Sequence, residues 1–314
     1  MSRVNIPAEI FLEKKRSRSD EPGKKQFRRL VNRPGEVYIY ITRKFGKINV
    51  SKAMADAEVT ILIPNYKTPE MTRLCLRLLR RHTDLERVQV VVIDNGSGDA
   101  SLDYLRGVNW IRLIERPEAA KEKGPEMHAR ALDLALKEVT TPYVLVMHTD
   151  TLICNDGWLD FLLGKISGDE TVAGVGSWKL EEPPSAFKQF GKKIESLLRR
   201  LLGKKTKVEE RYLRSHCALY RTELIRKRTN GFFDGDTAGH SLHRMLVQQG
   251  YKMRFLESQE LGRYLRHLNH ATMILNPQPG DRKTSKPSAR RRLQRQLDEL
   301  DYRNVLADST LDRI

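Results

Sequence analysis

The sequence predicts an α/β protein built on a mostly parallel sheet with helices on both faces. Between residues 57 and 155, short apolar runs alternate with segments of helical periodicity, which is the order that a doubly wound sheet requires. The apolar runs are nearly continuous, as expected for strands buried on both faces. Three of these runs end in polar residues, and such sheets bind their ligands beyond the carboxyl ends of the strands.

The individual elements follow from residue 57 onward. Strands are expected at Val59–Ile63, Val88–Ile93, Trp110–Ile114 and Tyr143–Met147. Helices are expected from Pro69 after a Thr68 N-cap, at Ser101–Gly107, at His128–Glu138, around Trp158–Leu163 and at Ser288–Leu306. The stretch Asp94–Asp99 contains two glycines and predicts a sharp turn.

The polar strand ends supply the candidate site: Pro64-Asn65-Tyr66, Asp94-Asn95-Gly96 and His148-Thr149-Asp150. The carboxylate of Asp94 can accept two hydrogen bonds, which suits a base N–H or a ribose diol; an Asx turn is the alternative. Asp150 follows a buried strand, and its carboxylate suits a hard divalent cation that also binds diphosphate oxygens. A capping or turn role before the next helix is the alternative for Asp150.

The charge of the chain is regional. The net charge is +17 over 314 residues, of which residues 1–50 carry +8 (13 Lys/Arg, 5 Asp/Glu) and residues 186–207 carry +7 (8 Lys/Arg, 1 Asp/Glu). Such basic segments indicate an anionic partner, which could be nucleic acid, anionic lipid or a phosphorylated substrate. Residues 186–207 also combine an apolar stripe with a basic face, which fits an interfacial membrane anchor or a packed insertion with a solvated face.

Other features bound the setting of the protein. No apolar run reaches the roughly 18 to 20 residues of a membrane span, and the polar N-terminus is unlike a signal peptide. Cys75, Cys154 and Cys217 are widely spaced, which favours buried thiols in a reducing, cytoplasmic setting.

Four segments together resemble the family 2 glycosyltransferases, which have the GT-A fold. They are Ile61–Tyr66, Val91–Asp99, His128–Asp133 and the strand that runs into His148-Thr149-Asp150. The resemblance spans roughly residues 57 to 280. It implies an inverting transferase that takes a nucleotide-diphosphate sugar as donor and a glycan or a lipid-linked acceptor, as in cell-envelope polysaccharide synthesis.

The resemblance also assigns roles to individual residues. The expected nucleotide-sugar contacts are Pro64, Asn65, Tyr66, Asp94, Asn95, His128, His148 and Thr149. Asp150 would be the last residue of the family's Asp-x-Asp metal motif, and His267 or His270 would complete the site at helical i, i+3 spacing. The first Asp of that motif is His148 here, and an imidazole ligand favours Mn²⁺ over Mg²⁺.

The acceptor half departs from the family pattern. Ser215–Arg221 resembles its acceptor-side strand, and Gly231–Asp234 resembles its Gly-Phe-Asp turn. The Glu-Asp pair that usually follows, and whose Asp is the catalytic base, is replaced by Ala238-Gly239. An inverting transfer needs a general base, so we rank Asp236 first, then His240, with Asp234 as a further candidate.

These observations predict three parts: a basic arm at 1–56 with a short strand at 37–41, a GT-A domain at 57–280 divided near residue 155, and a basic helical tail at 281–314. We expect a cytoplasmic enzyme, with residues 186–207 as the candidate segment for holding it on the inner face of the membrane. The rivals are a nucleotidyltransferase, whose Gly-rich basic loop is missing after the first strand, a nucleic-acid-binding protein, and a non-catalytic relative that binds glycans or nucleotides. A nucleic-acid partner is disfavoured because the basic segments lie outside the predicted sheet.

Overall fold

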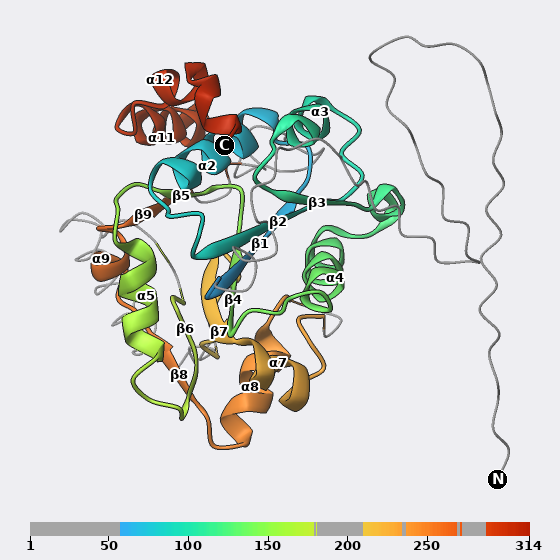
Figure 1. Cartoon of the computed structure of the whole chain (residues 1–314), viewed down its shortest axis with the longest axis vertical. Coiled ribbons are helices and arrows are strands. Elements are labelled where there is room, and N and C mark those ends of the chain that lie inside the picture. Colours follow the sequence, from blue (N-terminus) through green and yellow to red (C-terminus); the bar gives the residue numbers. More distant parts are fainter. Residues whose placement is uncertain (1–56, 179, 181–209, 234–236, 269–270, 272–286) are drawn as a thin grey trace, which may run out of the picture. The chain divides into compact units, whose positions relative to one another are not determined.

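The computed structural model describes residues 57–178, 180, 210–233, 237–268, 271 and 287–314, all of which belong to one compact unit, residues 37–314 (Figure 1). The predicted arm at 1–56 and the basic amphipathic segment at 186–207 lie outside the described residues. The predictions for those two segments therefore stay predictions.

A mixed, mostly parallel sheet of seven strands forms the centre of the described structure. Its order is β3 (Arg112–Glu115), β2 (Val88–Asp94), β1 (Val59–Asn65), β4 (Tyr143–Met147), β7 (Cys217–Arg221), β6 (Val172–Gly176) and β8 (Lys252–Phe255). The first four strands are parallel, and so are β6 and β8, whereas β7 runs antiparallel to both of its neighbours. The predicted α/β class with a mostly parallel sheet is confirmed.

Helices cover both faces of this sheet (Figure 1). The helices are α2 (Pro69–Arg81), α3 (Ala100–Gly107), α4 (Gly124–Leu136), α5 (Trp158–Ile166), α7 (Thr222–Arg228), α8 (His240–Gln248), α9 (Ser258–Leu261), α11 (Pro287–Asp298) and α12 (Tyr302–Ala307), with 3₁₀ turns η1 (Pro117–Lys121) and η2 (Ser309–Asp312). No helix among the described residues is long and apolar enough to cross a membrane.

Alternate residues of β1 point into two separate cores, as the pleat of a strand requires. Ile61 and Ile63 belong to the core that also contains side chains of α2, α5 and the C-terminal helices, whereas Leu62 belongs to the core that contains side chains of α4, α7 and α8. Both cores are closed to solvent, which is why the strands read as continuous apolar runs.

The structure differs from the predicted elements most clearly at three places. Trp110 lies before β3, and its indole N–H donates to the carbonyl of Leu311 at 2.9 Å. Helix α4 begins at Gly124, four residues before the predicted start, with Pro125 in its first turn, where the missing N–H costs nothing. The predicted single helix at 288–306 is two helices, because Asp301 takes a left-handed conformation (φ 49°) between them.

A second, two-stranded sheet pairs β5 (Thr151–Ile153) antiparallel with β9 (Leu265–His267). The sequence did not predict this sheet. His267 therefore lies at the end of a strand, and the helical spacing that we assumed for His267 and His270 was wrong for His267. His270 lies outside the described residues.

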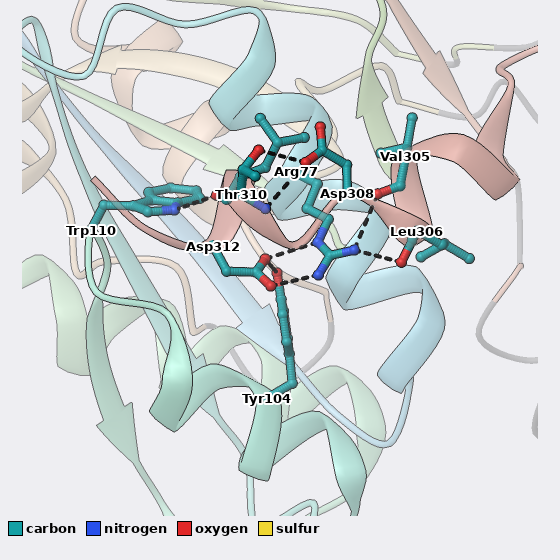
Figure 2. Close-up of polar contacts among 9 residues, drawn as sticks. Arg77, Tyr104, Trp110, Val305, Leu306, Asp308, Thr310 and Asp312 are labelled. Carbon is teal, nitrogen blue, oxygen red and sulfur yellow. Dashed lines mark hydrogen bonds and ion pairs between the residues drawn. The ribbon is translucent and has the colours of Figure 1, made fainter.

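The C-terminal segment packs on α2 through a buried arginine (Figure 2). The Nε and Nη2 atoms of Arg77 donate to the two carboxylate oxygens of Asp312 at 2.8 and 2.5 Å. Its Nη1 atom donates to the carbonyls of Val305 and Leu306 at 3.2 and 2.6 Å, and Tyr104 donates its hydroxyl to Asp312 at 2.8 Å. The last helices are thereby joined to the first helix of the sheet domain.

Candidate functional site

The polar ends of β1, β2 and β4 meet at one edge of the sheet. Strand β1 pairs in parallel with both β2 and β4, and Asn65 lies opposite Asp94 in the register. The predicted turn follows β2, and its Gly96 has φ +71°, a conformation that favours glycine. A Cβ atom at this position would lie 2.8 Å from the carbonyl oxygen of Pro117, so only glycine fits.

Asn65 is the centre of a buried hydrogen-bond network. Its Nδ2 atom lies 2.7 Å from Asp94 Oδ1, 3.2 Å from Ser97 Oγ and 3.0 Å from Ser101 Oγ. Its Oδ1 atom accepts the hydroxyl of Thr72 on α2 at 2.6 Å. Because Asn65 is fully buried and all its polar atoms are paired, its first effect is to fix the ends of β1, β2 and α2 relative to one another.

Asp94 and Asn95 are also engaged by the protein. The second oxygen of Asp94 accepts the backbone N–H of Ser97 at 3.0 Å, and only 1% of Asp94 is exposed. Asn95 accepts a hydrogen bond from Arg116 at 2.6 Å. Arg116, which the sequence did not single out, is itself buried and is held by Glu122 at 2.9 and 3.0 Å.

The geometry of these strand ends does not by itself show whether their side chains contact a nucleotide sugar. Pro64, like Asn65, is buried within β1, whereas Tyr66 just beyond the strand is partly exposed. Thr149 is 6% exposed. Direct nucleotide contact stays a prediction for each of them, and the side chain of Tyr66 is more accessible than those of Pro64, Asn65, Asp94 and Asn95.

A group of potential metal ligands lies beyond β4. One donor atom each from His148, Asp150 and His267 can be chosen so that all three lie within 4.8 Å of one another. The Oδ1 atom of Asp150 is 3.3 Å from His267 Nε2 and 3.7 Å from His148 Nδ1. Ligands at about 2.1 Å from a common ion with angles of 90–110° are about 3.0 to 3.4 Å apart, which is close to these spacings.

The β5–β9 sheet brings the late histidine to this place. His267 is paired in register with Thr151, and the backbone N–H of Leu268 donates to the Asp150 carbonyl at 2.8 Å. The Nδ1 atom of His267 is buried and has no hydrogen-bond partner among the described residues. The other ring nitrogen, Nε2, faces Asp150, so Nε2 is the atom of His267 that could bind an ion shared with Asp150.

Three further residues surround the group, and the sequence did not assign them to the site. The hydroxyl of Ser215 lies 3.0 Å from His148 Nε2 and 3.1 Å from His128 Nε2. The Nε2 atom of His216 lies 2.8 Å from the hydroxyl oxygen of Ser177. The His216 ring stacks on that of His267, with ring centroids 4.6 Å apart. Ser215 and His216 directly precede β7, which pairs with β4, and Ser177 directly follows β6, which pairs with the other side of β7.

Burial favours the neutral imidazoles of His128 and His148. It lowers the pKa of His128 to about 3, helped by the charge of His148, and it lowers the pKa of His148 to about 4. Burial alone would raise the pKa of Asp150, but the hydrogen bond and charge of His267, with the charges of His148 and His216, hold it below the ordinary value. A neutral His148 and an ionised Asp150 are in the protonation states that metal ligands require, and with His267 beside them they form a donor set that fits a divalent cation.

A second polar group lies on the acceptor side predicted from the sequence. His240 opens α8, and its Nε2 atom is 3.2 Å from the carboxylate of Glu210. Its ring packs on Tyr212 with centroids 4.9 Å apart. The guanidinium of Arg214 lies over the rings of both Tyr212 and Trp178, at 4.6 and 4.3 Å from their centroids. The other base candidates, Asp234 and Asp236, lie outside the described residues.

The two groups are adjacent along two strand ends. Ser177 contacts the histidine cluster, and the next residue, Trp178, belongs to the aromatic group. Arg214 likewise precedes Ser215, and its backbone N–H donates to the Ser177 carbonyl at 3.0 Å. The aromatic group therefore begins one residue away from Ser177 and Ser215, which contact the histidine cluster.

Comparison with known families identifies the class of protein. The model of glycosyl transferase family 2 matches residues 60–229, which include β1 to β4, Asp150, Ser215 and His216. The chain belongs to this family, as its sequence motifs indicated, and is therefore a glycosyltransferase by family. No curated protein matches the chain.

Several solved structures are similar to the chain. The mannosyltransferase PcManGT from Pyrobaculum calidifontis, solved with GDP-Man and Mn²⁺, is 21% identical over 65% of this chain and 56% of its own length, with a TM-score of 0.46. S. aureus TarS 1-349 is 16% identical over 79% of this chain and 73% of its own, also with a TM-score of 0.46. Glucosyl-3-phosphoglycerate synthase from Mycobacterium tuberculosis is 15% identical over 70% and 81%, with a TM-score of 0.40.

Proposed function

We propose that this protein transfers a sugar, with inversion, from a nucleotide-diphosphate sugar to a glycan or a lipid-linked acceptor, assisted by a divalent metal. The observation that carries the proposal is the convergence of His148, Asp150 and His267 beyond β4 in a family 2 chain. The donor would lie along the strand edge, with its nucleotide toward Tyr66 and Asp94 and its diphosphate toward Asp150.

The same three side chains would hold the metal. When bound, a divalent cation supplies positive charge opposite the leaving diphosphate. His128 is neutral and can offer a hydrogen bond but no charge, whereas the N-terminal end of α4 provides the partial positive charge of a helix dipole. Mn²⁺ is favoured over Mg²⁺ because two of the three donors are imidazoles.

The acceptor half would provide the general base. As the acceptor oxygen attacks the anomeric carbon, the bond from that carbon to the diphosphate breaks and the hydroxyl proton passes to the base. His240 is a base candidate among the described residues, and Glu210 would orient its ring through Nε2, which leaves Nδ1 for the proton. Asp236 and Asp234 remain candidates from the sequence.

The base assignment has its own test. Loss of a general base lowers kcat by about 10²- to 10⁴-fold. Asp236→Asn and His240→Gln should be compared with Glu210→Gln, with donor binding measured for each variant. The base is the residue whose substitution lowers kcat without weakening the binding of the donor. If Glu210 positions His240, substitution of Glu210 should also change the pH profile of kcat. Unchanged kcat in both Asp236→Asn and His240→Gln would reject these two assignments.

Residues 186–207 would hold this enzyme at an anionic membrane surface on the cytoplasmic side, where lipid-linked acceptors lie. Their sequence combines seven apolar residues at helical spacing with a net charge of +7. Flotation with phosphatidylserine-containing vesicles tests this role. The full chain should float and a chain without residues 186–207 should not; equal flotation of both would reject the anchor.

A thermal-shift screen tests the main proposal. UDP, GDP, dTDP and CMP sugars are added to the full chain, each with Mn²⁺ or with EDTA. We expect stabilisation by sugars of one base, and only in the presence of metal, because a ligand that binds the native state raises its stability by mass action. No stabilisation by any nucleotide sugar in any metal condition would contradict the proposal.

A further inference from the structure

We propose that His148, Asp150 and His267 bind one transition-metal ion before any nucleotide arrives. We further propose that this site ranks Co²⁺ and Zn²⁺ above Mn²⁺, and all three above Mg²⁺. The inference deepens the proposed function and rests on it, since it names the class of metal that the same site selects.

The three side chains are already assembled by the backbone. His148 and Asp150 lie on either side of a turn in which the N–H of Thr151 donates to the His148 carbonyl at 3.1 Å. His267 is fixed opposite this turn by the β5–β9 pairing. Because main-chain hydrogen bonds hold both sides, the protein need not fold around the ion, and the site can bind metal without a diphosphate to complete it.

The neighbouring side chains orient the imidazoles. The Ser215 hydroxyl lies against His148 Nε2, which leaves Nδ1 on the side of Asp150. A hydroxyl has one hydrogen, so Ser215 can donate to His128 while it accepts the Nε2–H of His148. This arrangement is compatible with the tautomer of His148 whose Nδ1 is free to bind metal, and such supporting contacts commonly tune metal affinity.

The ligand chemistry decides the metal class. Mg²⁺ and Ca²⁺ prefer oxygen donors, whereas two of the three donors here are imidazole nitrogens. For nitrogen donors the affinity rises from Mn²⁺ through Co²⁺ and remains high for Zn²⁺. The single carboxylate leaves one positive charge of a divalent ion uncompensated, so the filled site would still attract a diphosphate.

Metal binding can be measured without a known substrate. The full chain, without a polyhistidine tag and stripped with a chelator, is dialysed against Co²⁺, Zn²⁺, Mn²⁺ or Mg²⁺, and bound metal is counted by mass spectrometry. The visible absorption of bound Co²⁺ reports its coordination geometry and changes when a ligand is lost. We expect one ion per chain, with Co²⁺ and Zn²⁺ bound at least about tenfold more tightly than Mn²⁺ and with Mg²⁺ weakest.

Three variants locate the site. His148→Ala should weaken Co²⁺ binding by at least about tenfold and alter its absorption spectrum. His148→Asp keeps a polar ligand and should narrow the gap between Co²⁺ and Mn²⁺, because it exchanges a nitrogen for an oxygen donor. His82→Ala is the matched control, since His82 also faces a carboxylate, that of Asp156 at 2.7 Å, but lies outside the cluster. Thermal melting checks that each variant is folded.

The outcomes separate this inference from the proposed function. Mg²⁺ bound as tightly as Co²⁺, a Co²⁺ spectrum unchanged in folded His148→Ala, or no metal bound without nucleotide would each overturn the inference. Stabilisation by a nucleotide sugar that is as strong with Mg²⁺ as with Co²⁺ would also overturn it while the proposed function stands. The expected metal binding with no response to any nucleotide sugar would support the inference and contradict the proposed function.

Discussion

Arg77 and Asp312 are 235 residues apart in the sequence and form a two-pronged ion pair between α2 and the C-terminal segment (Figure 2). The arginine side chain is 5% exposed and the aspartate side chain 17%. The same helix holds Asn65 through Thr72 and lies against the carbonyls of His148 and Thr151 through Cys75. Helix α2 thus joins the end of the chain, beyond the family match, to the floor of the candidate site.

Replacing Arg77 with methionine should lower the free energy of unfolding by up to about 3 to 5 kcal/mol, because it leaves the partly buried Asp312 carboxylate without its cation and with the Tyr104 hydroxyl still bound to it. Chemical denaturation measures this loss. The matched control is Arg81→Met on the same helix, which removes an exposed pair with Asp308 at 3.9 Å and should cost less than about 1 kcal/mol. Equal effects of the two substitutions would show that burial of the Arg77 pair contributes nothing to the free energy of unfolding.

Substitutions at Asn65 and Tyr66 should distinguish a residue that stabilises the site from a residue that contacts the nucleotide. Asn65→Ala should lower the free energy of unfolding by about 2 to 3 kcal/mol, because it leaves buried partners such as Asp94 and Thr72 without their hydrogen bonds. Tyr66→Ala should change stability by less than about 1 kcal/mol. It should instead weaken nucleotide-sugar binding in a calorimetric titration. Donor affinity that is unchanged in Tyr66→Ala would remove Tyr66 from the predicted pocket.

The free energy of unfolding should fall in mild acid because His243 takes up a proton when the chain unfolds. Burial lowers its pKa to about 4, while the charge of Glu210 raises it and that of His240 lowers it, and its Nδ1 accepts the N–H of Leu213 at 3.3 Å. Its unfolded pKa is about 6.5, so below that pH the unfolded chain binds a proton that the native protein does not. The stability present above pH 6.5 is therefore lost progressively toward pH 4, by at most about 1.4 kcal/mol per pH unit.

Urea denaturation at pH 7, 6 and 5 measures this slope in the wild type and in His243→Asn, whose side-chain oxygen can also accept the Leu213 N–H. The variant should show a shallower decline, because it has no imidazole to protonate. Other buried histidines contribute to the wild-type slope, so the prediction concerns the difference between the two proteins. Identical slopes would mean that His243 takes up no additional proton on unfolding.

The sequence predicted the sheet and one part of the site for clear physical reasons. The run Val144–Met147 is apolar because the strand is buried on both faces, and it placed His148 and Asp150 at the edge where ligands bind. The family motifs predicted the same order of elements. His267 was identified as a candidate, but local pattern could not separate it from His270 or show that it lies on a strand.

The remaining features depend on contacts that sequence spacing does not encode. Ser215 and His216 were expected to lead into a strand, and only the neighbouring position of β7 and β4 brings them to His148. The bond between Arg77 and Asp312 joins segments at opposite ends of the domain. The break at Asp301 arises from a left-handed residue within an otherwise helical pattern, which periodicity did not reveal.

The most direct test of the central claim is a calorimetric titration of the nucleotide sugar selected by the thermal-shift screen into the wild type and into Asp150→Asn, each with Mn²⁺ and with EDTA. We predict that the wild type binds the donor only with metal and that Asp150→Asn loses at least about tenfold in affinity, which corresponds to about 1.4 kcal/mol. Donor binding of equal strength in EDTA, or equal affinity of Asp150→Asn and the wild type with Mn²⁺, would contradict the account.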